Sequence, residues 1–160
     1  MITEDFVSYK VAKLLKEKGF KESTRFVWYE HLPSQNAVYN SEIGKPKRDY
    51  FYWEKEGERN SLWTNESPVP SYISGEVYSC PTLQMIMKWL REKGFHINVS
   101  ISYDYSVDAD GNVVDKWTFW LFEILSSFSG NLIYTEEVNE YDSYEEAVDA
   151  AIKYCLENLI

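Results

Sequence analysis

The sequence lacks most of the residue patterns that indicate a particular chemistry. It holds only two cysteines, Cys80 and Cys155, and only two histidines, too few for a disulfide framework or a metal cluster. Its 7 glycines form no glycine-rich turn of the kind that binds phosphates or dinucleotides. No apolar run approaches the ~18 residues of a membrane-spanning helix, and none follows Met1 as in a signal peptide. We therefore expect a cytoplasmic protein without a cofactor, a metal or a membrane partner.

A concentrated positive charge is also lacking. The chain has 26 acidic and 16 basic residues and a formal net charge of −10, whereas binding nucleic acid through its phosphates needs a positive surface. The one basic cluster, residues 45–48, lies in a stretch with glycine and proline, and we interpret it as a solvated loop. The acidic residues are scattered along the chain rather than concentrated as in a DNA mimic. We therefore expect no nucleic-acid partner.

What the sequence does contain is a repeated helix ending. The residues LLKEKGF at 14–20 return as WLREKGF at 89–95, and each copy closes an amphipathic stretch with cations and then a glycine, Gly19 or Gly94. Glycine readily adopts the left-handed conformation that ends a helix, and cations are favoured at the negative end of the helix dipole. Both helices are therefore predicted to end at these glycines.

The apolar periodicity places three helices along the chain. The last one begins with the capping box at residues 143–146, in which the serine and the glutamate satisfy free amide groups of the first turn. Cys155 falls on the apolar stripe of that helix, so we expect a buried, inert thiol. The predicted helices span residues 4–18, 83–93 and 144–160.

Alternation of apolar and polar residues marks the strands. The clearest strand covers residues 96–105, and the Asp-Gly pair within residues 108–112 predicts a tight hairpin to an antiparallel partner at residues 113–125. Apolar residues on both faces of that partner indicate a central or covered strand. Shorter strands are predicted at residues 25–32, 37–39, 50–54, 76–79 and 132–135.

Together these elements predict an α+β fold, in which an antiparallel sheet has helices packed on one face. The repeated ending arranges the chain as two related helix-then-strands halves, at about residues 4–32 and 79–107. Residues 33–80 have no linker composition that would separate two domains. We therefore expect residues 1–160 to form a single α+β domain.

Two patterns invite a catalytic or metal-binding interpretation, and neither meets the requirements of such a site. Residues 108–115 look like part of a calcium loop, but Ser106 and Trp117 stand where the first ligand and the bidentate acid belong. His96 and Asp104 share one face of a strand, yet they would lie ~26 Å apart along it, too far for a catalytic triad. We therefore expect no catalytic, cofactor-binding or metal-binding residues and favour a protein without enzymatic activity.

The aromatic content is the strongest remaining signal, with 6 Trp, 13 Tyr and 8 Phe. A sheet with helices on one face cannot bury aromatic residues of both faces. Either a second layer built from residues 33–80 covers the other face, or an aromatic surface is left for a partner protein or for a second copy of the chain, as in a homodimer. Core packing accounts for most of these residues. The candidates for an interaction surface are Trp28, Trp53, Trp63, Tyr103 and Trp120.

A second hypothesis is a small-molecule or glycan-binding or glycan-hydrolysing protein. Aromatic side chains also stack on sugars, and carboxylates such as Glu54 and Glu56 would line a cleft between the first sheet segment and residues 33–80. A deep pocket with two convergent acids would favour this hypothesis. A contiguous exposed apolar patch would favour the interaction hypothesis.

Segments of the three predicted helices resemble a known group of proteins. The segments are residues 6–9 with 12–20, residues 80–84 with 88–93, and residues 144–147 with 151–156. They are similar to small uncharacterised proteins of phages and prophages of Bacteroides-type bacteria. The resemblance implies no activity and no site residues. It implies a cytoplasmic accessory protein of a phage or mobile element, which would act on a host or phage protein.

Overall fold

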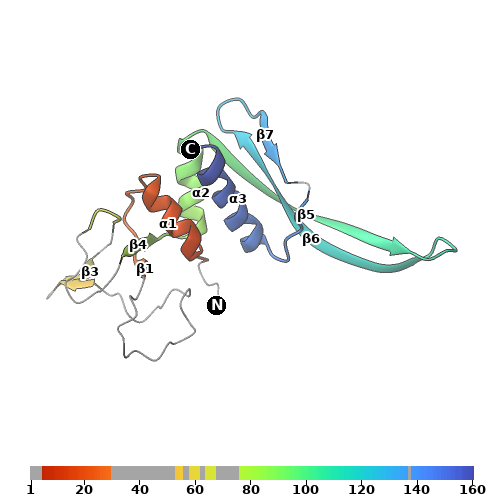
Figure 1. Ribbon diagram of the computed structural model, residues 1–160, viewed down its shortest axis with the longest axis horizontal. Helices are drawn as coiled ribbons and strands as arrows, with labels where there is room; N and C mark the ends of the chain where they lie inside the picture. The colour runs from red at the N-terminus through yellow and green to blue at the C-terminus, as the bar shows by residue number, and fades with distance from the viewer. Residues whose placement is uncertain (1–4, 30–52, 56–57, 62–63, 68–75, 137) are drawn as a thin grey trace. The chain divides into compact units, whose positions relative to one another are not determined.

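The computed structural model describes residues 5–29, 53–55, 58–61, 64–67, 76–136 and 138–160 (Figure 1). Within these residues the protein has three helices and antiparallel strands, and helices pack against sheet, which confirms the α+β fold. The chain divides into two compact units, residues 1–82 with Ile160, and residues 83–159. Each unit has its own helix or helices, its own sheet and its own buried core. The single domain predicted for residues 1–160 stays a prediction.

The first unit is built on a two-stranded antiparallel sheet. Strand β1 (Phe26–Tyr29) pairs with β4 (Val77–Cys80), and helix α1 (Tyr9–Glu17) packs on β4. A second antiparallel pair joins β2 (Trp53–Lys55) to β3 (Glu58–Ser61). The strands predicted near residues 25–32 and 76–79 are thus confirmed in part. The strand predicted at 37–39 and the first residues of the one at 50–54 lie outside the described residues.

Helix α1 begins five residues later than the predicted residue 4. Ser8 is its N-cap, and the Ser8 hydroxyl accepts a hydrogen bond from the Val11 amide at 3.4 Å. The residues before the cap are extended, because the Val7 amide donates to the Pro81 carbonyl at 3.1 Å. Pairing with the segment after β4 therefore satisfies backbone groups that a longer helix would otherwise have used.

The second unit is a three-stranded antiparallel sheet with two helices. The sheet has the order β5-β6-β7, with β5 (Phe95–Val107), β6 (Val113–Ser126) and β7 (Leu132–Thr135). Helix α2 (Leu83–Glu92) packs on β5, and helix α3 (Tyr144–Asn158) packs on β5, β6 and α2. The predicted hairpin and the strand at residues 132–135 are confirmed.

The core of this unit lies between the helices and one face of the sheet. The apolar stripes of both helices are buried there, including Cys155, in agreement with the sequence pattern. The capping box of α3 is present with one difference: the Ser143 hydroxyl accepts from the Glu146 amide at 3.1 Å, while the Glu146 carboxylate accepts from the Asp142 amide at 3.2 Å. The fully buried large side chains of this core are Ile86, Leu90, Phe122, Ile124, Val148, Ile152 and Leu156.

The repeated helix ending has the predicted geometry in both copies. Gly19 has φ +76° and Gly94 has φ +101°, in the left-handed region that favours glycine. The segments after the two glycines differ, because β5 begins at once at Phe95 whereas β1 begins only at Phe26. The repeat therefore encodes a helix ending and not a complete helix-and-strand unit.

The prediction that the strand at residues 113–125 is central or covered is confirmed only in part: β6 is the middle strand of the order β5-β6-β7, but its first half is exposed. Strand β6 is central only near its end, where residues 123–125 pair with β7 on one side and with β5 on the other. Its first half pairs with β5 alone within the described part of the chain, and Val113, Val114 and Trp117 are 61%, 66% and 40% exposed. Apolar residues on both faces therefore do not indicate cover on both faces in this strand.

Candidate interaction surface

The distal half of the β5–β6 hairpin extends past the helices and past β7 of its own unit (Figure 1). We call residues 101–120 the arm. Among the described residues, its two strands pair only with each other, apart from a backbone pairing at the base, where the Trp120 amide donates to the Tyr141 carbonyl at 2.8 Å and the Tyr141 amide donates back at 3.1 Å. The arm is therefore a two-stranded ribbon attached to the core at one end.

One face of the arm continues the buried face of the sheet. Residues two apart in a strand share a face, and directly paired residues of antiparallel strands project to the same side. Ile97 and its partner Ile124 are buried at the base. On the same face of β5, Val99 comes next and is half-buried, and Ile101, Tyr103 and Tyr105 follow and are 60%, 62% and 53% exposed. We call these three residues the apolar stripe.

The helix layer stops where the apolar stripe begins. Tyr144, the first residue of α3, contacts the Trp120 ring edge-on with 5.6 Å between ring centroids. Trp120 is paired with Ile101 in the sheet register and is half-buried. The apolar pattern of β5 therefore runs beyond the last residue pair that a helix of this unit covers.

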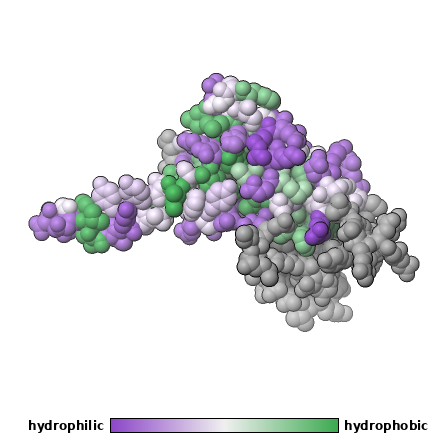
Figure 2. Space-filling view, turned by 180° about the vertical axis from the view of Figure 1, so that it is seen from behind, coloured by the Kyte–Doolittle hydropathy of each residue, from purple (hydrophilic) through white to green (hydrophobic). Residues whose placement is uncertain are grey.

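The opposite face of the arm also carries apolar groups. Trp117 is 40% exposed and Phe119 is half-buried on that face. Near the tip, Val107 and Val113 are 54% and 61% exposed. Figure 2 shows a hydrophobic patch near the end of the arm, with hydrophilic side chains at its tip. An exposed apolar surface that gathers on one projecting element is typical of an interaction site.

The net charge of the arm is negative, but its acids lie away from the face of the apolar stripe: Asp104 and Asp115 project to the opposite face, and Asp108 and Asp110 lie in the turn at the tip. The arm holds four acids and one base, Lys116, which gives −4 + 1 = −3. The Lys116 ammonium lies 4.4 Å from the centroid of the Tyr103 ring. Exposed acids also surround the first turn of α3 beside the base of the arm. These acids are Asp142, Glu145 and Glu146.

The tip of the arm is an ordered hairpin turn. The Asp108 carboxylate accepts hydrogen bonds from the Asp110 amide at 3.0 Å and from the Asn112 amide at 2.8 Å, and Gly111 has φ +86°. These hydrogen bonds hold the pKa of Asp108 below its ordinary value, and those from Asn112 contribute most. The hairpin interpretation is thus confirmed over the calcium loop.

The five predicted interaction residues do not form one surface. Trp28 is 5% exposed and its indole donates to the Val7 carbonyl at 3.1 Å, so it is a core residue. Its neighbour Val27, on the other face of β1, is also buried, which the sequence pattern does not reveal. Trp53 lies in β2 with its side chain outside the described residues, and Trp63 lies outside them altogether. Among the members of this set that the structure describes, Tyr103 and Trp120 are brought together, on the helix side of the arm.

The carboxylate-lined cleft stays a prediction. Glu54 lies in β2, but its side chain falls outside the described residues, as does the whole of Glu56. Among the described residues, no group of three or more His, Cys, Asp or Glu side chains is arranged to hold a metal ion. His96 pairs with Leu125 near the base of the sheet and is half-buried.

The two thiols are poor nucleophiles. Cys80 and Cys155 are free and buried, and burial raises the pKa of each to about 12. A hydrogen bond involving Trp28 opposes this rise at Cys80 without cancelling it. Both groups are therefore protonated at neutral pH, which agrees with the inert thiol predicted at position 155.

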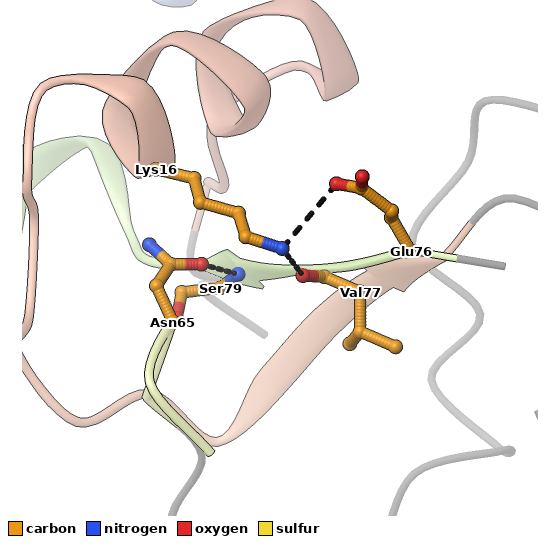
Figure 3. A network of polar contacts seen from close by, with 5 residues as sticks. All are labelled: Lys16, Asn65, Glu76, Val77 and Ser79. Carbon is orange, nitrogen blue, oxygen red and sulfur yellow. Dashed lines mark hydrogen bonds and ion pairs between the residues drawn. The ribbon is translucent and has the colours of Figure 1, made fainter. Parts of the chain in front are cut away.

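A polar network in the first unit stabilises the outer edge of β4 (Figure 3). The Lys16 ammonium donates to the Val77 carbonyl at 3.1 Å and to the Glu76 carboxylate at 3.4 Å, while the Asn65 side chain accepts from the Ser79 amide at 2.8 Å. Within the described part of the chain, these side chains bind backbone groups on the edge of β4 that faces away from β1, which protects this edge from unwanted pairing. The Ser79 hydroxyl is buried and has no hydrogen-bond partner among the described residues. We assign the network a structural role.

A buried carboxylate, Glu136, closes the loop after β7. It is 7% exposed, and its oxygens accept from the Val138 amide at 3.0 Å, the Asn139 amide at 3.2 Å and the Tyr134 hydroxyl at 3.3 Å. Burial alone would raise the pKa of Glu136, but the hydrogen bonds outweigh burial and hold the pKa below the ordinary value. No sequence pattern indicates this role, because Glu136 and its neighbour form an ordinary acidic pair.

We expect Glu136→Gln to lower the free energy of unfolding at pH 7 by about 1–2 kcal/mol, because the amide accepts these hydrogen bonds more weakly than the carboxylate. A depressed pKa adds stability above the unfolded-state pKa of about 4.3, and this stability is lost as the pH falls through the lower folded value. The stabilities of the two proteins in urea unfolding should therefore converge as the pH falls below the lowered folded-state pKa of Glu136. Glu140→Gln, an exposed carboxylate of the same loop, is the control, and an equal loss in both variants would contradict the assignment.

Comparison of the chain with protein-family models, with curated proteins and with solved structures found no match. In the described part of the chain, no helix is both long enough and apolar enough to cross a membrane.

Proposed function

We propose that this chain is a non-catalytic interaction protein whose binding element is the arm. The observation that carries the proposal is the apolar stripe, which continues, beyond the half-buried Val99, the face on which Ile97, Phe122 and Ile124 are buried. Isolated exposed apolar residues are common on protein surfaces, but a contiguous stripe continuous with a core face marks a site of contact. The arm also offers Tyr and Trp, the residues most often found at interface hot spots.

The resemblance of the helices to phage and prophage proteins supplies the context of the proposal. The partner would be a protein of the host or of the mobile element, and the chain would act in the cytoplasm as an accessory protein. The acidic charge of −10 supports a protein partner rather than nucleic acid.

The test is quantitative affinity enrichment from a lysate of the host with three forms of the protein. These forms are the wild type, the arm variant Ile101→Ser/Tyr103→Ser and the control Leu132→Ser. Leu132 is 58% exposed on β7, close to the 60% of Ile101, so the control removes an equally exposed apolar side chain outside the arm.

We expect one near-stoichiometric partner that the wild type and the control retain and that the arm variant loses. The substitutions are at exposed positions, so the thermal unfolding of all three forms should agree within the effect of ordinary surface substitutions, about 0.5 kcal/mol. Equal recovery of every bound protein by the arm variant would rule out the arm as the binding element.

A further inference from the structure

The outer edge of β5 presents backbone groups that no other strand of the described residues binds. β5 is an edge strand, which pairs with β6 on one side only. The Trp120 amide and carbonyl both bind Tyr141 on the side away from β5, so Trp120 and its register partner Ile101 exchange no hydrogen bonds. The backbone groups of Ile101 therefore point to the open edge. Because direction alternates along a strand, those of residues 97, 99, 103 and 105 point there as well.

A strand that pairs with this edge must alternate between apolar and polar residues. Its side chains would continue the two faces of the sheet. One face beside the edge carries the apolar stripe, and the other carries the polar side chains of residues 96, 98, 100, 102 and 104. β5 is itself an extended segment with this alternation over residues 95–105. A second copy of the chain therefore offers a matching strand.

The polar face of β5 selects one register for two copies. In an antiparallel pair about a two-fold axis, each residue lies opposite the residue equally far beyond the axis. His96 and Asp104 lie four residues to either side of Ser100. An axis at Ser100 is therefore the symmetric register that sets this imidazole opposite the carboxylate, twice in each dimer, and opposite charges directly across two strands are favourable. An axis at Asp104 would set two carboxylates opposite each other.

The apolar face fits the same register. An axis at Ser100 sets the three residues of the apolar stripe opposite residues 99, 97 and 95 of the second copy, which are Val, Ile and Phe. Pairs of aromatic and β-branched residues stabilise antiparallel sheets. Ile97 is buried at the base of the sheet, where α2 and α3 pack on β5. The exposed stripe of each copy would thus lie beside the helix-covered part of the other, which removes apolar surface from water.

We propose that two copies of this chain form a dimer in which the outer edges of their β5 strands pair antiparallel about a two-fold axis at Ser100. The dimer joins the two three-stranded sheets and closes the open edge of each β5. The formal net charge of −10 on each copy opposes association at long range, but physiological salt screens exposed charges that are farther apart than about 8 Å. The inference goes beyond the proposed function, because this edge needs no partner of another kind.

Cysteine cross-linking tests the register. Ser100 would face its own copy in a pair without backbone hydrogen bonds, where the two Cα atoms are ~4.5 Å apart, within the range of a disulfide. Asn98 and Ser102 would each lie ~13 Å along the strand from their own copies. Under mild oxidation we expect Ser100→Cys to form a covalent dimer at least about tenfold faster than Asn98→Cys or Ser102→Cys, whereas a mixture of the latter two should cross-link. Cys80 and Cys155 are buried, which keeps both thiols out of the reaction.

Exchange of the facing charges tests the self-complementary pairing in analytical ultracentrifugation. We expect the wild type to dimerise and His96→Asp to raise the dissociation constant about tenfold, because two pairs of like charges then face each other in each dimer. His96→Asp/Asp104→His should recover most of the affinity. Ser106→Asp is the matched control, because it adds the same charge on the same face at an exposed position that has no β5 residue opposite it in this register.

The outcomes separate the dimer from the proposed function. A monomeric wild type, or a Ser100→Cys protein that cross-links no faster than its neighbours, overturns the dimer. Failure of His96→Asp/Asp104→His to recover the affinity overturns the register. Ser100 is exposed whereas His96 is half-buried, so cross-linking decides the question even if substitution at His96 impairs folding. The proposed function fails only if the arm variant retains every protein captured from the lysate, whatever the oligomeric state.

Discussion

Phe122→Ala is expected to lower the free energy of unfolding of the second unit by about 3–5 kcal/mol, the usual cost of removing a fully buried aromatic side chain. Phe122 is 1% exposed, and its ring centroid lies 5.9 Å from those of Tyr134 and Tyr141. It pairs with Val99, immediately before the arm. Its loss leaves a cavity at the point where the arm joins the core.

Phe128→Ala is the matched control, because Phe128 lies in the same unit and is 84% exposed. We expect the control to change stability by no more than about 0.5 kcal/mol. Urea unfolding followed by tryptophan fluorescence measures both variants, and similar losses would contradict the core described for this unit. The comparison also serves the binding experiments, because Phe122→Ala shows what loss of the folded base does to partner capture, whereas Ile101→Ser/Tyr103→Ser removes only exposed groups.

The features that sequence predicts well are determined by few neighbouring residues. The capping box at Ser143, the hairpin turn at Asp108 and the left-handed glycines at positions 19 and 94 each depend on a short segment whose hydrogen bonds or backbone angles are local. Alternation alone predicts the strand from residue 96 onward, and β5 covers it. These elements form in any fold that contains their segments.

The features that sequence does not predict depend on distant partners. Helix α1 begins only after Ser8, because the Val7 amide binds the backbone carbonyl of Pro81 and keeps the preceding segment extended. Pro81 is more than seventy residues away in the sequence. The alternation in β5 is the same at Ile97, which is buried, and at Ile101, which is exposed. The alternation of apolar and polar residues shows which residues share a face of the strand. Whether those residues are buried depends on where the helices that cover the face end.

The candidate site is predictable only in part for the same reason. Residue type indicates Tyr103 and Trp120 as interaction candidates. The sequence assigns Ile101 and Tyr105 only to the apolar face of a strand, and it predicts no interaction role for them. Trp28 carries the same aromatic signal as Tyr103 and is a core residue. Residue type therefore indicates which side chains suit an interface, and only the extent of the helix layer shows which of them are exposed.

The two copies of the repeated helix ending should respond differently to the same substitution, because their glycines have different neighbours. Among the described residues, a Cβ atom added at Gly19 would meet nothing within 4 Å, whereas one added at Gly94 would lie 2.7 Å from the Phe128 ring. Both positions have positive φ, and +101° at Gly94 lies farther from the left-handed helical minimum than +76° at Gly19. We expect Gly94→Ala to cost about 1–3 kcal/mol and Gly19→Ala about 1–2 kcal/mol, so that Gly94 is the more sensitive position.

Removal of the clashing ring separates the two causes at Gly94. In the double variant Gly94→Ala/Phe128→Ala, the steric part of the loss should disappear while the backbone strain stays, so the two substitutions should be non-additive in urea unfolding. Phe128 is exposed and its ring can turn away, which keeps the steric part smaller than the backbone part. Two results would contradict this explanation. One is a larger loss of unfolding free energy in Gly19→Ala than in Gly94→Ala, and the other is strict additivity of the two substitutions in the double variant.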